Sequence, residues 1–210
     1  MRYDPKFTKE EIAENHKYFT ERMALYKSLG QDFTGSREFI LDKAGALKGS
    51  ILEVGSGSGY MALTLAKAGY NFASIDNDME SLKKTALNLA YENLLPKVEL
   101  RLMDGKSLSF KNGSFDNIFA INMFHHIDGV DDILSEMDRV LRQSGKIITS
   151  DFNRQGMDMI DAMHKKEGRV HTNFGVTEGH VYSYFSDLGY EINKHEDDYH
   201  WVIIAKKKNR

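Results

Sequence analysis

The chain has 210 residues, no cysteine and a formal net charge of −3. These values exclude disulfides, thiolate zinc sites and cysteine nucleophiles, and they give no basic footprint for nucleic acid. No apolar run approaches the roughly 20 residues of a membrane span, and the polar N-terminus does not look like a signal peptide. We therefore expect one cytoplasmic domain that binds neither nucleic acid nor membrane.

Two helices are predicted ahead of the first strand. Thr8 and Glu11 match a capping box, and apolar residues then recur on one helical face until Gly30, where the helix is expected to end. A loop over residues 31–36 and a second helix over residues 36–46 follow. Because both helices precede the sheet, they can pack on its edge or fold over its top.

From residue 50 the chain alternates strand patterns with helical patterns. Strands are predicted over residues 50–55, 71–76, 98–103, 115–121 and 146–151, and helices over residues 78–93 and 130–142. This alternation is typical of a parallel α/β sheet with helices on both faces. Such sheets bind ligands at the carboxyl ends of their strands, so functional residues are expected there.

The pattern changes after residue 151. Helices are predicted over residues 155–167 and 177–188, with a loop over residues 168–176 between them. The segments YEINKHE and YHWVIIAKK then read as two strands on either side of an acidic connection. Strands joined so tightly run antiparallel, so the chain is expected to end on a hairpin.

The stretch LEVGSGSGYMALTLA, residues 52–66, is a strand-to-helix turn with alternating glycines. The dinucleotide fingerprint G-x-G-x-x-G would place its third glycine at position 60, which is Tyr60 here. Taken alone, the glycines are also explained by a tight turn and close helix–strand packing. The ligand must therefore be identified from the residues around the turn.

Acidic residues stand at or near the carboxyl ends of three consecutive predicted strands. Glu53 precedes the glycines, Asp76 ends the second strand and Asp104 ends the third. A carboxylate beside the turn repels a pyrophosphate but attracts a cation. Asp76 also has the offset from the turn at which an acid accepts hydrogen bonds from ribose hydroxyls. The cluster suits a positively charged nucleoside that carries no phosphate.

In the order and spacing of its motifs, the chain resembles class I S-adenosylmethionine-dependent methyltransferases of the small-molecule type. The motifs read LEVGSGSG, SIDND, MDGKSLSF, SFDNIFAINMFHHI and EMDRVLRQSGKIITSDF, within roughly residues 34–152. The resemblance implies a Rossmann-like, doubly wound sheet of seven mostly parallel strands with an antiparallel last strand. It also implies one domain, with an N-terminal helical cap or lid (1–47), a cofactor-binding core (48–153) and substrate-side helices with the final hairpin (154–210).

The resemblance further implies S-adenosylmethionine as cofactor and S-adenosylhomocysteine as product. By position, Gly55, Ser56, Gly57 and Gly59 would let the backbone approach the methionine and ribose, Asp76 would take the ribose hydroxyls, Asp104 and Gly105 would contact the adenine, and Asn122 would lie beside the methionine end. Glu53 would orient either the loop or the amino acid end of the cofactor. Asn77 either shares the ribose or caps the next helix.

The candidate catalytic residues are His125 and His126, in NMFHHID just past the fourth strand. The reaction would be an in-line displacement at the methyl carbon, which needs a general base only if the acceptor is a protonated weak acid. His126 and Asp128 are candidates for a base and its orienting carboxylate. The alternative is that the histidine pair only packs or binds backbone. The scattered His164, His171 and His180 lack ligand spacing, so no metal site is expected.

A small molecule is the expected acceptor. The motif of nucleobase amino methylases is missing after the fourth strand, and cysteine-dependent methylation is excluded by composition. Aromatic and methionine residues that could enclose an acceptor are Tyr18, Tyr26, Phe33, Phe152, Met157, Met159 and Phe174, although most of them can equally be ordinary core. One alternative is a member of the family that methylates protein or RNA, or that binds the cofactor without catalysis. A nicotinamide-dependent oxidoreductase is a further alternative, but Tyr60 in place of a glycine and the carboxylate of Glu53 count against it. The oligomeric state is not indicated.

Overall fold

The computed structural model describes residues 1–166, 168 and 173–208. In this described part, eight strands form one sheet in the order β1-β4-β3-β2-β5-β6-β8-β7. The strands are β1 (Arg2–Tyr3), β2 (Ile51–Val54), β3 (Phe72–Asp76), β4 (Val98–Leu102), β5 (Phe115–Ile121), β6 (Leu141–Phe152), β7 (Glu191–Glu196) and β8 (His200–Lys206). Strands β2 to β6 pair in parallel, whereas β8 pairs antiparallel with both β6 and β7. The predicted sheet with its antiparallel last strand is thus confirmed.

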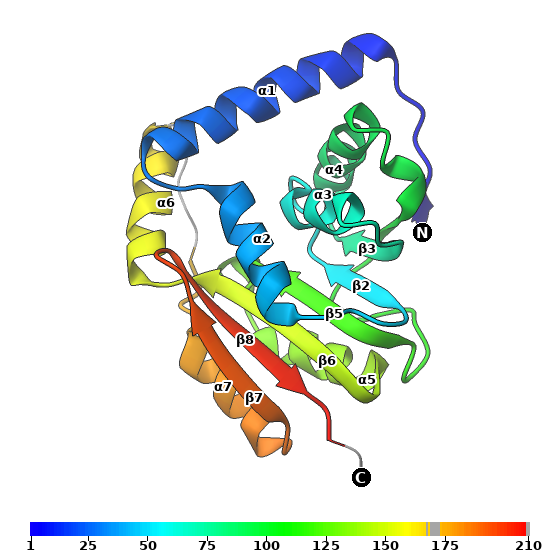
Figure 1. The fold of residues 1–210 in the computed structure, drawn as a ribbon, viewed down its shortest axis with the longest axis vertical. Helices are drawn as coiled ribbons and strands as arrows, with labels where there is room; N and C mark the ends of the chain where they lie inside the picture. The colour runs from blue at the N-terminus through cyan, green and yellow to red at the C-terminus, as the bar shows by residue number, and fades with distance from the viewer. Residues whose placement is uncertain (167, 169–172, 209–210) are drawn as a thin grey trace.

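Helices cover both faces of the sheet (Figure 1). They are α1 (Lys9–Ser28), α2 (Phe33–Ala44), α3 (Tyr60–Lys67), α4 (Met79–Tyr91), α5 (Val130–Val140), α6 (Arg154–Lys166) and α7 (Glu178–Asp187), with short 3-10 turns η1 (Leu95–Lys97) and η2 (Phe124–His126). One core lies under α2, α3 and α4, and the other lies under α5 and α7. Alternate residues of the central strands feed the two cores, for example Ile147 and Ile148 of β6.

The two N-terminal helices lie on the side of the molecule where the functional strand ends are expected. Helix α1 crosses the top of the molecule from α4 to α6 (Figure 1). Its predicted capping box is present, because the Thr8 hydroxyl accepts from the Glu11 N–H and the Glu11 carboxylate accepts from the Thr8 N–H. Tyr26 of α1 packs with Phe33 of α2 and with residues of α6 in a third, smaller core.

Three features differ from the sequence prediction, each for a local reason. Helix α2 begins at Phe33 rather than 36, because the Asp32 carboxylate caps the N–H groups of Thr34 and Gly35. Strand β6 starts at 141 rather than 146, and its pairing with β5 contains an irregularity between Phe115 and Asn117. The two-residue edge strand β1, antiparallel to β4, is too short to carry a sequence pattern.

The parallel register brings the ends of the central strands to one edge of the sheet. Val54 pairs with Ile75 and Ala120, Asp76 pairs with Leu102, and Ile121 pairs with Ser150. The loops that follow these strands therefore meet at one edge, as the rule for parallel sheets requires.

No helix in the described ranges is long and apolar enough to cross a membrane. The expected cytoplasmic location and the proposed division into cap, core and substrate-side segments stay predictions.

Candidate active site

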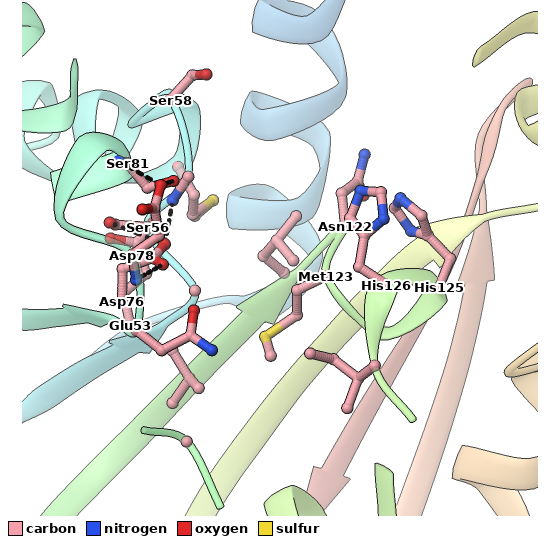
Figure 2. Close-up of a pocket in the computed structure, with 18 of the residues that line it drawn as sticks. Glu53, Ser56, Ser58, Asp76, Asp78, Ser81, Asn122, Met123, His125 and His126 are labelled. Carbon is pink, nitrogen blue, oxygen red and sulfur yellow. Dashed lines mark hydrogen bonds between the residues drawn. The ribbon is translucent and has the colours of Figure 1, made fainter. Parts of the chain in front are cut away.

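A cavity of about 720 Å³ lies at the carboxyl ends of β2 to β6, under α1 and α2. Its walls include Glu53, Gly55, Ser56, Gly57, Asp76, Asn77, Asp104, Gly105, Asn122, His125 and His126, eleven of the twelve residues expected from the sequence. Figure 2 shows the acids Glu53, Asp76 and Asp78 on one side and Asn122, His125 and His126 on the other. Gly59 is the one expected residue that does not line the cavity. The labelled side chains divide the cavity into an acidic wall and a histidine-bearing wall.

The glycine turn is held by the acid at the end of β3. Asp76 Oδ2 accepts the Gly57 N–H at 2.8 Å, and its Oδ1 accepts the Asp78 N–H at 3.0 Å. Gly57 has a φ of 54°, and a Cβ there would meet nothing within 4 Å, so its backbone faces open space. Asp76 Oδ2 also accepts from the Ser56 hydroxyl at 3.4 Å, whereas Oδ1 can still accept a further hydrogen bond from a ligand.

Gly59 serves packing rather than the cavity. It has a φ of 82° at the start of α3, and a Cβ there would lie 3.1 Å from the Cα of Thr85 in α4. A side chain at this position would push α4 away from the turn. Gly59 therefore faces α4 and does not line the cavity in which a ligand was expected to contact it.

Glu53 is a buried carboxyl, 2% exposed, whose Oε2 accepts the hydroxyl of Ser74. Burial raises the pKa of Glu53 to about 8, and the hydrogen bond from Ser74 and the nearby Arg37 only partly offset this effect. The carboxyl is therefore mostly protonated at neutral pH without a ligand. A cation bound beside it would favour the ionised form.

The remaining residues of the acidic wall follow β3 and β4. Asp104 Oδ1 accepts the Lys106 N–H at 2.9 Å, and a Cβ on Gly105 would lie 3.3 Å from Val54, which leaves little room for a side chain. Asn77 lines the cavity, but Asp78 rather than Asn77 caps α4, since Asp78 accepts the N–H groups of the first turn. The capping alternative for Asn77 is thus wrong.

The opposite wall holds a buried histidine–carboxylate pair. His125 Nδ1 lies 2.6 Å from Asp151 Oδ1, and the His125 N–H donates to Asp151 Oδ2 at 2.9 Å. The His125 and Asp151 side chains are 3% and 2% exposed. Asp151 also accepts the N–H of Phe152 at 2.8 Å. The pair joins η2 to the end of β6, so both the position and the orientation of the imidazole are fixed.

This geometry corrects the expected pairing of His126 with Asp128. The carboxylate that contacts His125 is that of Asp151, whereas the carbonyl of Asp128 accepts from the Lys106 ammonium. His126 is exposed, and its ring lies 3.9 Å from that of His125. Asp151 follows the same sequence rule as Asp76, since it is an acid at the carboxyl end of a strand.

The other histidines do not gather with this pair into a metal site in the described ranges. No group of three or more His, Asp or Glu side chains there is placed to hold a metal ion. His164 lines the cavity, whereas His180 bonds Asp131 at 2.6 Å on the surface. His171 lies outside the described residues.

Arg37 of α2 brings a buried cation to the cavity wall, and no sequence signal indicated it. Its side chain lies over the Phe33 ring at 5.1 Å, and Phe33 stacks on Tyr60 at 5.0 Å. Burial lowers the pKa of Arg37 to about 10 and raises that of Tyr60 to about 12, so Arg37 stays charged and Tyr60 neutral at pH 7. Arg37 Nε is buried without a hydrogen-bond partner.

The aromatic residues expected around an acceptor divide between cavity and core. Tyr26, Phe33, Phe152 and Phe174 line the cavity. Met157 and Met159 pack in the third core, and Tyr18 is 56% exposed on α1. The cavity wall is therefore aromatic where α1, α2 and β6 meet.

The order of the strands and the acidic cavity at their carboxyl ends define a class I nucleoside-binding fold. Residues 52–149 match the family model described as "Methyltransferase domain". A phosphatidylethanolamine N-methyltransferase of Cereibacter sphaeroides is 28% identical over 156 residues, which are 74% of this chain and 76% of that protein. A ubiquinone biosynthesis O-methyltransferase of Xanthomonas oryzae pv. oryzae is 29% identical over 59% of this chain, which spans only 48% of that protein.

A solved structure of a SAM-dependent methyltransferase from Aquifex aeolicus has the same fold, with a TM-score of 0.66 and 18% identity, over 96% of this chain and 99% of that one. Residues 52–149 thus correspond to a methyltransferase domain. This match and the named relatives support a class I S-adenosylmethionine-dependent methyltransferase enzyme. This match favours a methyltransferase over the oxidoreductase alternative.

The residues of the cavity fit S-adenosylmethionine. Two residues that line the cavity each carry a buried polar atom without a hydrogen-bond partner, namely the donor Arg37 Nε and the acceptor Asn122 Oδ1. Such unmatched atoms are costly, and a zwitterionic amino acid supplies a carboxylate for one and an ammonium for the other. The acidic wall suits the ribose, the adenine and the positive charge.

Proposed function

We propose that the protein methylates a small molecule whose acceptor atom carries a weakly acidic proton, with His125 as the general base. The observation that carries this proposal is the buried His125–Asp151 pair on the cavity wall opposite the acids. An acceptor that is already a free nucleophile needs no base, so a carboxylate-oriented imidazole favours a hydroxyl group or an acidic carbon.

The proton moves through the chain's own residues. Asp151 accepts a hydrogen bond from the Nδ1–H of His125, so Nε2 is the ring nitrogen that would take the proton of the acceptor. When bound, S-adenosylmethionine would supply an electrophilic methyl group to the electron pair of the deprotonated acceptor, and its sulfur would keep the electrons of the broken bond as the neutral thioether. Asp151 stabilises the imidazolium that results.

The cofactor would lie across the strand ends with its amino acid part between Glu53, Arg37 and Asn122. Arg37 would hold the carboxylate, and Asn122 Oδ1 would accept from the ammonium. Asp76 would accept from the ribose hydroxyls and Asp104 from the adenine amino group. These assignments are supported by the positions of the side chains on the cavity walls and by the unmatched atoms of Arg37 and Asn122.

The aromatic part of the cavity would hold the acceptor. Tyr26, Phe33, Phe152 and Phe174 line it beside His125, and aromatic walls favour a planar apolar acceptor. The relatives are named as a phosphatidylethanolamine N-methyltransferase, a ubiquinone biosynthesis O-methyltransferase and a ubiquinone/menaquinone biosynthesis C-methyltransferase. A phenol or an enolisable carbonyl compound therefore suits both the base and the walls.

Methyl transfer to a metabolite panel would test the proposal. The chain is incubated with S-adenosylmethionine and three groups of acceptors, namely phenols and enolisable carbonyl compounds, amines, and denatured protein or RNA. Release of S-adenosylhomocysteine should occur with the first group and should fall at least a hundredfold in His125→Asn. Activity only with amines or macromolecules, or an unchanged rate in His125→Asn, would refute it.

A further inference from the structure

His200 lies fully buried at the start of β8 and touches the cofactor half of the cavity only through other side chains. Its Nδ1 lies 3.0 Å from Asp197 Oδ1, in the connection between β7 and β8. Its Nε2 lies 3.0 Å from Asn122 Nδ2 and 3.5 Å from Arg37 Nη1. His200 therefore links the final hairpin to the two residues proposed to hold the amino acid end of the cofactor.

The contacts define which ring nitrogen of His200 carries the proton. Asp197 is an acceptor, so Nδ1 must donate to it. Arg37 has only donors, so Nε2 must offer it a lone pair. Burial lowers the pKa of His200, Arg37 acts in the same direction, and Asp197 and Asp151 oppose both. Neutral His200 with its proton on Nδ1 satisfies all three partners at once.

The state of His200 also decides how the amide of Asn122 is turned. An Nε2 lone pair requires the Asn122 NH₂ group, which leaves the buried Oδ1 without a partner in the protein. Asn122 has a φ of 54°, which is unusual for a residue with a side chain, so its backbone is also set in one conformation. The unmatched acceptor at the cavity wall follows from these bonds.

We propose that Asp197 and His200 are positioning residues, which hold the Asn122 amide so that its oxygen receives the ammonium group of the cofactor. The proposal rests on the cofactor arrangement of the proposed function. An amide turned the other way would present two N–H groups to the ammonium and repel it. The Asp197 carboxylate also accepts the N–H groups of Tyr199 and His200 at 2.9 and 2.7 Å. The connection between β7 and β8 therefore fixes the chain of hydrogen bonds from Asp197 through His200 to Asn122, which we call the relay.

Two ligands that differ only in the amino acid end separate positioning from a general structural effect. Calorimetry measures the binding of S-adenosylhomocysteine and of 5′-methylthioadenosine, which lacks the aminobutyrate part. His200→Leu should lower the affinity for S-adenosylhomocysteine about tenfold and leave the affinity for methylthioadenosine unchanged. His200→Gln keeps an acceptor oxygen near the position of Nε2 and should recover most of the loss. His195→Gln in the neighbouring β7 is the matched control and should bind both ligands normally.

Equal weakening of both ligands in His200→Leu, or no weakening of S-adenosylhomocysteine, would overturn the relay. Failure of the unmodified chain to bind S-adenosylhomocysteine would instead refute the cofactor arrangement itself. A second measurement reads the tautomer of His200 directly in the unmodified chain. Nitrogen NMR of ¹⁵N-histidine-labelled protein should show a protonated Nδ1 and an unprotonated Nε2 at pH 7, and the signal of His200 is assigned by its loss in His200→Gln. The opposite tautomer would refute the proposal.

Discussion

The two walls of the cavity differ in charge and in origin. The wall with Glu53, Asp76 and Asp104 is acidic, and it is built by the ends of three strands that follow each other in the chain. The opposite wall carries His125 and Arg37, and it combines α2, η2 and the end of β6.

The difference separates binding from proton transfer. The acidic wall stabilises a positive charge by fixed carboxylates, so it acts on affinity for the cofactor. The histidine-bearing wall has one buried imidazole held by a carboxylate, so it acts on the rate of the chemical step. Substitutions of the acids and of the His125–Asp151 pair should therefore affect different measurements.

The largest effect is expected from Asp151→Asn on the histidine-bearing wall. The asparagine keeps the shape of the side chain but holds no charge to stabilise the His125 imidazolium. Turnover should fall about 10²–10⁴-fold, the usual contribution of a general base, while affinity for S-adenosylhomocysteine stays within twofold. Steady-state kinetics and calorimetry measure the two quantities.

Two controls accompany this variant. Asp158→Asn changes an exposed acid on α6, and His126→Asn changes the exposed neighbour of the proposed base. Both should retain turnover. An equal loss of turnover in His126→Asn and Asp151→Asn would indicate that His126, and not His125, is the base.

Glu53→Gln tests the acidic wall through the pH dependence of stability. The pKa of Glu53 is raised to about 8 in the folded protein from its ordinary 4.5. Between these values the folded state binds more protons than the unfolded state, so this group makes stability fall as pH rises. Its contribution is at most about 1.4 kcal/mol per pH unit, and glutamine should remove it.

Chemical denaturation at pH 5, 6, 7 and 8 measures this contribution. The difference in the free energy of unfolding between Glu53→Gln and the unmodified chain should grow in favour of the variant as pH rises. Glu38→Gln, at an exposed position on α2, should run parallel to the unmodified chain. A constant difference for Glu53→Gln would mean that the carboxyl is ionised throughout.

The sequence predicted the acidic wall better than the opposite one for a physical reason. Asp76 and Asp104 are found by counting strand ends, because the parallel register brings successive ends together. Asp151 follows the same rule and could have been found from SDF at the end of the fifth strand. Arg37 meets His200 only through the packing of α2 against β8, which no local pattern encodes. Gly59 matched the motif but serves the contact with α4.

Asp76→Ala should lower the affinity for S-adenosylhomocysteine more than tenfold, since a hydrogen bond to a charged group contributes about 1.5–3 kcal/mol. Part of the effect will come from the glycine turn, which loses its bond from Gly57 to Asp76. Asp187→Ala is the matched control, because this acid at the end of α7 is exposed and does not line the cavity. Calorimetry should show normal affinity in the control. Unchanged affinity in Asp76→Ala would refute the ribose assignment.

The smallest effects are expected from Arg37→Met, and they should have opposite signs. Removing a buried charge with an unmatched Nε relieves a desolvation cost, so the free energy of unfolding without ligand should rise by about 1 kcal/mol. Removing the proposed partner of the cofactor carboxylate should weaken S-adenosylhomocysteine about tenfold, or about 1.4 kcal/mol. Methylthioadenosine has no carboxylate and should bind as before. Arg154→Met, exposed on α6, should change neither quantity. A variant that loses stability and binds both ligands equally poorly would show that Arg37 supports the fold rather than the ligand.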